Sequence, residues 1–332
     1  MKSIVITSIA NDQHPILHQI ADECLKRSLP FLVIGDRKSP DQFNLNGCDF
    51  YSLERQRDLP FQLAQITPER HYSRKNLGYL VAIKQGATEI QETDDDNIPL
   101  AAFWENSTPI INGLGVHLGG WTNVYAHFSK TSVWPRGFPL EFLKNNQEIA
   151  GINGQYDCPI QQGLANDNPD VDAVFRLVGK LPIDFDPQPS LVLLKNSWCP
   201  FNSQNTRWYR KAFPLLYLPS FCSFRMTDIW RSFVAQRISW ECNWGILFHE
   251  ATVRQERNEH NLLKDFEDEI PGYLNNARIA KALESLTLKP GEVSLYDNLI
   301  TCYQQLVELG VVDSQELPLV QAWIQDCQEL LK

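Results

Sequence analysis

The chain has 332 residues, of which 43% are hydrophobic and 21% charged, so a folded protein is expected and wholesale disorder is excluded. Its 30 Lys and Arg against 40 Asp and Glu give a formal charge of −10, which argues against nucleic acid as the main partner. No apolar run approaches the ~20 residues that cross a bilayer, and the eight cysteines contain no CxxC pair. We therefore expect no membrane anchor, no disulfide scaffold and a reducing, cytoplasmic location.

The N-terminal part alternates short apolar runs with helical patterns. Ser3–Ala10 and Phe31–Ile34 are typical of buried strands, and Pro15–Arg27 between them has the spacing of one helical face. This order predicts parallel strands joined by a right-handed crossover. A second such unit follows, with a helix expected over Arg70–Gly86 and a strand over Thr88–Glu92.

The rest of the chain has a different pattern of apolar residues and chain breakers. Residues 109–163 contain many chain breakers and predict mixed strands and loops, while Leu191–Leu194 predicts a strand and Met226–Trp240 a helix. Three further helical patterns cover Ala277–Leu288, Val293–Leu309 and Asp313–Leu331. We therefore expect an α/β domain over residues 1–272, followed by a C-terminal helical subdomain over residues 273–332.

An acidic triplet, Asp94-Asp95-Asp96, directly follows the last strand of the second unit. Adjacent carboxylates repel one another unless water or a cation compensates them, and divalent cations prefer carboxylate oxygens. Ligands of open α/β sheets bind at the carboxyl ends of the strands, where this triplet is expected. Asp94 and Asp96 are thus candidates for one metal, with Asp95 beside them. The alternative is a solvated acidic turn.

Other candidates for a phosphorylated ligand lie nearby in the predicted fold. Arg74 and Lys75 could neutralise a diphosphate, and Gly78 would permit a close approach of the backbone. Asp36, after the second strand, is a turn residue or a contact to a base or ribose. Thr7, within the first predicted strand, is a further candidate for a nucleotide contact.

Later in the chain, several residues are candidates for an acceptor side or a metal site. Arg136 lies in a rigid, aromatic loop, and Asp172 follows Pro169 in a loop. Asp228, at a helix start, is either a helix cap or an acid/base or acceptor-binding group. His249 or His260 could complete an oxygen-rich metal site, although an ordinary surface histidine is the alternative for each.

No P-loop, GxGxxG, GxSxG or HExxH motif is present, which removes the commonest nucleotide-binding, hydrolase and zinc-protease interpretations. Several longer blocks instead occur together. They are SRKNLGYLVAI (73–83), SVWPRGFPLE (132–141), IQQGLANDNPDVDAVF (160–175), CPFNSQNT (199–206) and DIWRSFVAQRISWE (228–241). In combination with the acidic triplet, they closely resemble the STELLO family of glycosyltransferase-like proteins. A more distant likeness is to reversibly glycosylated polypeptides, the UDP-arabinopyranose mutases.

The resemblance implies a GT-A glycosyltransferase fold, a Rossmann-like mixed sheet, with a nucleotide-sugar donor, UDP-sugar being favoured. It also implies Mn²⁺ or Mg²⁺ bridging the diphosphate, with Asp94 and Asp96 as the metal-binding DXD motif. His260 would be the histidine, late in the chain, that completes the metal site. Asp228, with Asp172 as its competitor, would act on the hydroxyl group of a carbohydrate or other acceptor.

Three functions remain open at this point. The leading one is a metal-dependent glycosyltransferase. The second is a sugar-nucleotide mutase or self-glycosylating protein of the same fold, because the mutases carry a glycosylated arginine in a loop that Arg136 resembles. The third is a non-catalytic scaffold with a nucleotide pocket.

Overall fold

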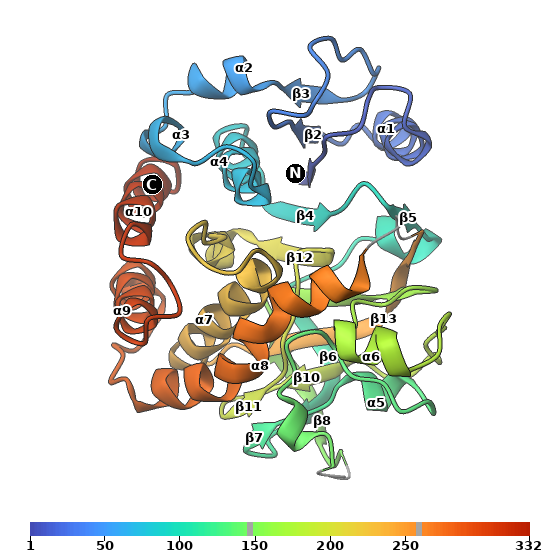
Figure 1. Ribbon diagram of the computed structural model, residues 1–332, viewed down its shortest axis with the longest axis vertical. Coiled ribbons are helices and arrows are strands. Elements are labelled where there is room, and N and C mark those ends of the chain that lie inside the picture. Colours follow the sequence, from blue (N-terminus) through green and yellow to red (C-terminus); the bar gives the residue numbers. More distant parts are fainter. Residues whose placement is uncertain (145–148, 257–260) are drawn as a thin grey trace.

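The computed structural model describes residues 1–144, 149–256 and 261–332. Within these ranges a mixed sheet forms the centre of the molecule and helices pack on both of its faces (Figure 1). The strand order is β3-β2-β1-β4-β12-β9-β13-β10-β6-β8, and β5 pairs with β13. The predicted α/β class, with a Rossmann-like mixed sheet and a helical C-terminus, is confirmed.

The strands of this sheet are β1 (Lys2–Thr7), β2 (Phe31–Ile34), β3 (Asp49–Tyr51), β4 (Glu89–Thr93), β5 (Asn97–Pro99), β6 (Ile110–Val116), β8 (Ile152–Asp157), β9 (Ile160–Asn166), β10 (Leu191–Leu193), β12 (Asn205–Tyr209) and β13 (Ile246–Gln255). A separate pair joins β7 (Gly120–Trp121) to β11 (Ser197–Trp198). The α-helices are α1 (Pro15–Arg27), α2 (Leu53–Arg57), α3 (Gln62–Ile66), α4 (Lys75–Lys84), α5 (Tyr125–Phe128), α6 (Ala173–Val178), α7 (Thr227–Glu241), α8 (Leu262–Ser285), α9 (Leu295–Glu308) and α10 (Glu316–Leu330). Short 3₁₀ turns cover Tyr72–Arg74, Ala101–Trp104, Leu140–Phe142, Arg210–Leu216, Phe224–Met226 and Glu292–Ser294.

The N-terminal half has the predicted crossover topology. β1 pairs in parallel with both β2 and β4, and α1 connects β1 to β2. Side chains of β1 alternate between the two faces of the sheet, as a strand requires. Ile4 and Ile6 belong to the apolar cluster of α1, whereas Val5 belongs to the cluster of α4. The sheet is thus covered on both faces here.

The candidate functional residues lie at one edge of the sheet. β1, β2, β4, β9 and β13 all run in the same direction, so their carboxyl ends meet at this edge. β12 is antiparallel to its neighbours and therefore starts at the same edge. Open α/β sheets bind their ligands at this edge.

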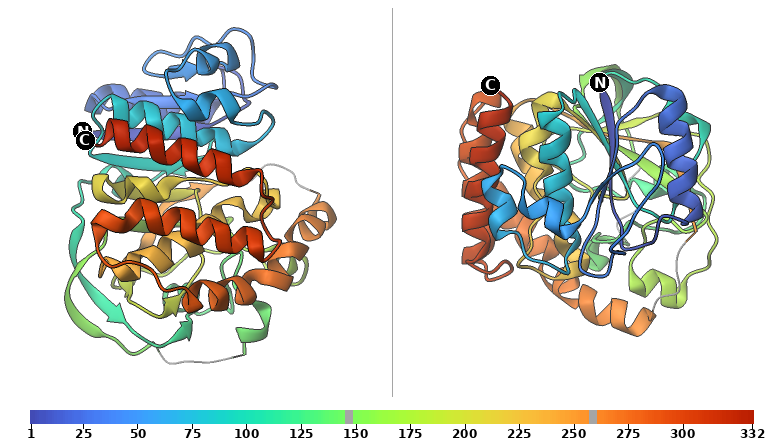
Figure 2. Two further views of the ribbon diagram at one scale, coloured as in Figure 1. Left: turned by 90° about the vertical axis from the view of Figure 1, so that its left-hand side faces the viewer. Right: turned by 90° about the horizontal axis from the view of Figure 1, so that it is seen from above.

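The last two helices pack on the outer side of the helices that cover one face of the sheet, α10 against α4 and α9 against α7 (Figure 2). Asp326 of α10 accepts hydrogen bonds from the backbone N–H groups of Gln62 and Leu63, both at 2.9 Å, and so caps α3. Glu316, at the start of α10, accepts from the N–H of Ser220 at 2.9 Å. The expected boundary at 272/273 falls inside α8, and a division into two domains stays a prediction. No helix in the described ranges combines the length and apolar character of a membrane span.

Several elements differ from the sequence expectations. β12 and β13 were not predicted, because polar side chains interrupt the apolar runs by which buried strands are recognised. The helix expected from Ala277 begins at Leu262, and Pro271-Gly272 lies inside it. The helix expected from Arg70 begins at Lys75 after a 3₁₀ turn, since Arg70 has a left-handed φ of 60°.

A buried ion pair joins the sheet to α7. Arg231 of α7 donates to both carboxylate oxygens of Glu92 on β4, at 3.0 and 2.7 Å, and both side chains are fully buried. Trp208 donates its indole N–H to the same carboxylate at 2.8 Å. Arg231 also donates to the carbonyl of Asn202 at 3.0 Å and thereby holds the segment that enters the candidate site.

Candidate functional site

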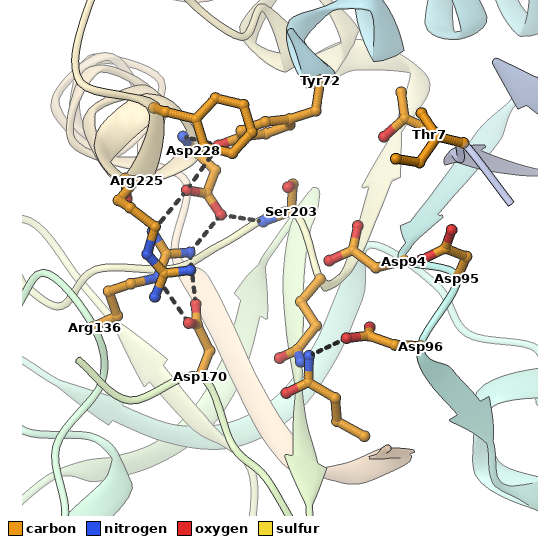
Figure 3. Close-up of a pocket in the computed structure, with 14 residues that line it drawn as sticks. Thr7, Tyr72, Asp94, Asp95, Asp96, Arg136, Asp170, Ser203, Arg225 and Asp228 are labelled. Carbon is orange, nitrogen blue, oxygen red and sulfur yellow. Dashed lines mark hydrogen bonds and ion pairs between the residues drawn. The ribbon is translucent and has the colours of Figure 1, made fainter. Parts of the chain in front are cut away.

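Two adjoining cavities open at the carboxyl edge of the sheet. The first, of about 420 Å³, is lined by the acidic triplet on one side and by Arg136, Asp170 and Asp228 on the other (Figure 3). The second, of about 700 Å³, is lined by the loop after β2 and by residues 70–72 and 74. We call them the acidic cavity and the basic cavity. Both are lined by Thr7, Ile9, Tyr72, Asp95 and Phe224, so they form one continuous cleft.

The acidic triplet lies directly after β4, as predicted. Asp94 accepts a hydrogen bond from Lys75 Nζ at 2.9 Å, and Asp95 accepts one from the hydroxyl of Ser8. Burial raises the pKa of Asp94, and the ammonium group of Lys75 opposes that rise. Burial, together with the charges of Asp94 and Asp95, raises the pKa of Asp96 to about 7. The triplet thus concentrates negative charge, which the ammonium group of Lys75 offsets in part.

Two buried oxygens at the triplet have no hydrogen-bond partner within the described residues. They are Asp96 Oδ1 and Gln255 Oε1. Asp96 Oδ2 accepts from Gln255 Nε2 at 2.9 Å, so the two side chains are held together at the cavity wall. Buried unpaired acceptors are costly, and hard divalent cations prefer such oxygens. The donor set therefore fits Mn²⁺ or Mg²⁺, although no group of three or more His, Cys, Asp or Glu side chains in the described ranges forms a metal site by itself.

Across the cavity, Arg136 joins two aspartates. Its Nε and Nη2 donate to Asp170 at 2.7 and 2.9 Å, and its Nη1 and Nη2 donate to Asp228 at 3.1 and 2.9 Å. Nη1 also donates to the carbonyl of Arg225. All five N–H groups of the guanidinium are thus engaged, and Arg136 is buried. We call Arg136, Asp170 and Asp228 the arginine clamp.

Asp228 belongs to the first turn of α7 and lines the acidic cavity. It is not the helix cap, because Met226 occupies that position and Asp228 lies in the first turn of α7. Although burial raises its pKa, the charge and hydrogen bonds of Arg136 and the charge of Arg231 hold the pKa of Asp228 at about 2. It also accepts from the backbone N–H of Ser203 at 3.1 Å. A carboxylate with so low a pKa is a weak general base at neutral pH.

Asp172 lies outside both cavities. The sequence placed it in a loop, whereas in the structure it begins a helix. Asp172 is the N-cap of α6 and accepts from the N–H of Phe175 at 2.7 Å, while its other oxygen accepts from the indole of Trp134 at 2.7 Å. Burial raises its pKa to about 6. These contacts give Asp172 a structural role in orienting α6.

The two basic residues expected at a diphosphate are used inside the protein. Lys75 is fully buried and lines neither cavity, since its ammonium group binds Asp94. Arg74 lines the basic cavity, but it donates to the side chain of Gln56 at 2.7 Å and to the carbonyls of Thr67 and Pro68 at 3.0 and 3.1 Å. Arg74 thus fixes the loop that precedes the 3₁₀ turn.

Other cations surround the basic cavity. The side chains of Lys38 and Arg70 line it and make no hydrogen bond or ion pair with any residue in the described ranges. Arg70 adopts a φ of 60°, which disfavours residues with a Cβ, and this conformation is held by Asp36. One oxygen of Asp36 accepts from the N–H of Arg70 at 2.9 Å and the other from the N–H of His71 at 2.8 Å. Strained backbone at a cavity wall is typical of functional sites.

The structure describes one of the two histidines that were candidates for the metal site. His249 lines a different cavity, on β13, and is therefore not next to the triplet. His260 lies outside the described residues. A third histidine, His71, lines the basic cavity, where burial lowers its pKa to about 4 and its ring stacks on Tyr72 with centroids 5.5 Å apart.

The structure brings together Thr7, Asp94, Asp95, Asp96, Arg136 and Asp228 at the acidic cavity, and Asp36 and Arg74 at the basic cavity. It adds residues that the sequence had not singled out as site candidates. They are Tyr72, Asp170, Ser203, Gln204, Phe224, Arg225 and Gln255 at the acidic cavity. Asp170, Ser203 and Gln204 belong to the sequence blocks on which the resemblance was based, so membership of a block was a usable signal for them. Gln255 could have been found only from the strand that ends there.

Comparison with known proteins points to one family. Residues 225–331 match the family model of STELLO glycosyltransferases. Two Arabidopsis thaliana proteins are similar over most of the chain: "Probable glycosyltransferase STELLO1" is 29% identical over 323 residues and "Probable glycosyltransferase STELLO2" 30% identical over 318 residues. These alignments cover 90% and 89% of this chain but 41% of each relative, so the chain spans about two-fifths of their length.

The match to the family model includes Arg225, Asp228 and Gln255, which line the acidic cavity. The relatives extend the similarity to the N-terminal half of the chain, where β4 and the triplet lie. The resemblance that the sequence blocks indicated is thus confirmed by the family model and by both relatives. The chain is thus similar to STELLO-type, glycosyltransferase-like proteins.

Proposed function

We propose that the chain is a metal-dependent glycosyltransferase that takes a nucleotide-sugar donor, with a UDP-sugar as the leading candidate. The family supports the transfer of a sugar. The observation that carries the metal dependence is the pair of unpartnered, buried oxygens of Asp96 and Gln255 beside the acidic triplet. A solvated acidic turn would leave no buried acceptor without water or a partner.

In this proposal each cavity has its own role. Asp94, Asp96 and Gln255 would hold Mn²⁺ or Mg²⁺, which when bound offsets the charge of the leaving diphosphate. Lys75 limits the repulsion within the triplet by pairing with Asp94. The basic cavity would take the nucleoside part, with Arg70 and Lys38 directed at phosphate oxygens in place of Arg74 and Lys75.

The arginine clamp faces the triplet across the acidic cavity (Figure 3). In this proposal the acceptor binds on the side of the clamp. We propose that it orients the acceptor hydroxyl and the Ser203 segment, since Asp228 binds both Arg136 and the N–H of Ser203. The same bonds weigh against self-glycosylation at Arg136. Every N–H of its guanidinium is already donated, so no nitrogen is free to attack a sugar.

Release of nucleoside diphosphate tests the reaction. The protein is incubated with a panel of UDP- and GDP-sugars and Mn²⁺, and nucleoside diphosphate and intact protein mass are both measured. We expect diphosphate release from at least one donor, dependent on Mn²⁺, with no gain of protein mass. A mass gain equal to one sugar would favour the self-glycosylating alternative. Absence of release with every donor, with or without an added acceptor mixture, would contradict the transferase.

Arg70 provides a separate prediction, because its binding role and its backbone strain can be uncoupled. Arg70→Gly and Arg70→Ala should both weaken UDP binding about tenfold, the loss of one charge-assisted contact. Only the glycine variant should become more stable, by about 1 kcal/mol, because glycine tolerates a φ of 60° and alanine does not. Calorimetric titration and chemical denaturation measure the two effects. Unchanged UDP affinity in both variants would remove Arg70 from the site.

A further inference from the structure

A third cavity, of about 590 Å³, lies on the sheet away from the candidate site. None of the residues that line it lines the acidic or the basic cavity. Its floor is formed by Gln161 of β9, Arg207 of β12, and His249 and Thr252 of β13. Its rim is formed by residues 105–107 and by residues 187–190. We call it the sheet-face cavity.

The floor of this cavity is polar where a sheet interior is normally apolar. Arg207 and Gln161 are register partners on neighbouring strands, so they share one face of the sheet. Trp208, the next residue of β12, points to the opposite face, where Arg231 of α7 lies over its ring. The α7 face is thus closed by a helix and apolar side chains, and the other face carries buried polar ones.

These floor side chains are held in a hydrogen-bonded layer. Arg207 donates to Gln91 at 3.2 Å and pairs with Glu89 at 3.1 Å, and Gln161 donates to the carbonyl of Thr108 at 2.8 Å. Asn205 donates to Thr252 Oγ1 at 2.7 Å. Buried polar layers are less stabilising than apolar packing, so their presence under an open cavity indicates a binding surface.

Gly163 makes room for this layer. A Cβ at this position would lie 2.5 Å from Asn205 Nδ2, 2.6 Å from Thr252 Oγ1 and 2.8 Å from His249 Cε1. Gly163 has an ordinary backbone conformation, so a turn does not explain the glycine. It lets His249 and Thr252 of the cavity floor come close to Asn205 of β12.

The charges of the cavity restrict its ligand. The charge of Arg207 is already paired with Glu89, and burial lowers the pKa of His249 to about 4, so its imidazole is neutral at pH 7. Glu105 and Glu250 are exposed at the rim and would repel an anion. Phosphates, nucleotides and uronates are therefore disfavoured.

The rim offers uncharged groups for hydrogen bonds. The side-chain amides of Asn106, Asn112 and Gln188 make no hydrogen bond with any residue in the part of the chain that the structure describes. Each amide can donate and accept, which matches hydroxyl groups that also do both. Pro187 and Pro189 add apolar surface between them. This combination suits the hydroxyl and C–H faces of a sugar ring.

We propose that the sheet-face cavity is a second binding site, separate from the cleft at the acidic triplet, for a neutral saccharide of about two to three rings. The inference rests on the polar floor, the glycine and the free amides of the rim. It does not depend on the reaction proposed for the cleft, because the two sites share no residue.

The test uses three trisaccharides as probes in calorimetric titrations: maltotriose and cellotriose, which are neutral, and trigalacturonate, which is anionic. At least one neutral probe should bind the full chain, and trigalacturonate should bind at least about tenfold more weakly. Asn112→Leu and Gln188→Leu should each weaken the neutral probe about tenfold while UDP binding stays unchanged. Gln304→Leu, on the exposed side of α9, is the matched control and should change neither.

Asp96→Asn provides the reverse comparison, because it should abolish Mn²⁺-dependent UDP binding and leave saccharide binding intact. The proposal is overturned if neither neutral probe binds at about 10 mM, if trigalacturonate binds as tightly as they do, or if both rim variants bind the neutral probe like the wild type. If UDP binding fails in the wild type while the saccharide results hold, the failure belongs to the proposed function and not to this site.

Discussion

Replacement of Arg136 by leucine is expected to lower the free energy of unfolding by about 3–5 kcal/mol, the usual cost of removing one partner from a buried ion pair. The reason lies in the clamp. Without the guanidinium, the buried carboxylates of Asp170 and Asp228 lose their shared cation and face each other across its place. Urea denaturation at pH 7 measures the loss.

The same substitution should reverse the effect of acid on stability. In the wild type the pKa of Asp228 is about 2, below the ~3.9 of an unfolded aspartate. Its stabilising contribution is therefore present above about pH 4 and is lost as the pH falls through 2. In Arg136→Leu the two carboxylates should titrate above their unfolded values. Acidification from about pH 7 to 5 should then stabilise the variant, because the folded state takes up protons.

Two controls make this result specific. Arg254→Leu removes an exposed arginine that pairs with Glu256, and it should cost less than about 1 kcal/mol at any pH. Arg136→Lys retains the charge but loses the bidentate fork, so we expect an intermediate loss. A loss below about 1 kcal/mol in Arg136→Leu, with no reversal in acid, would show that the clamp does not hold the two aspartates together.

The second large effect is expected from Asp96→Asn, which should stabilise the metal-free protein by about 1–3 kcal/mol. The substitution removes a charge from a triplet in which Asp96 Oδ1 is buried without a partner and Asp94 and Asp95 repel it. A carboxylate kept at the expense of stability is typical of a functional site. In the presence of Mn²⁺ and UDP the order should invert, because only the wild type gains stability from bound ligand.

Thermal unfolding with and without Mn²⁺ and UDP measures both parts of this prediction. Asp184→Asn, which changes an exposed aspartate outside both cavities, is the matched control and should behave like the wild type. The account of the triplet fails if Asp96→Asn is less stable than the wild type without metal and still gains stability from Mn²⁺ and UDP.

Local patterns in the sequence predicted the elements whose signals are local. Pro15–Arg27 and Phe31–Ile34 have the predicted bounds, because an amphipathic period and a short apolar run need no information from the rest of the chain. The triplet was placed at a sheet edge for the same reason, since it directly follows a strand. β13 was missed because its polar residues line cavities, which a hydrophobic pattern cannot distinguish from a loop.

The arrangement of the site depends on contacts between distant parts of the chain. Arg136 meets Asp170 and Asp228 across 34 and 92 residues, and no spacing in the sequence indicates that one arginine binds both. Gly78 was expected to permit a close approach of a ligand to the backbone. In the structure it permits a close approach of the sheet instead. A Cβ there would lie 2.7 Å from the side chains of both Val5 and Ile34, so this glycine serves the packing of α4.

The most direct test of the central claim is a calorimetric titration of the wild-type chain with UDP, performed with Mn²⁺ and again with the metal removed by a chelator. The account predicts binding that requires Mn²⁺ and weakens at least about a hundredfold without it, because Asp94, Asp96 and Gln255 would otherwise face the diphosphate uncompensated. Equal UDP affinity with and without Mn²⁺ would contradict the metal-dependent site. It would favour the alternative interpretation, in which the acidic triplet is a solvated turn.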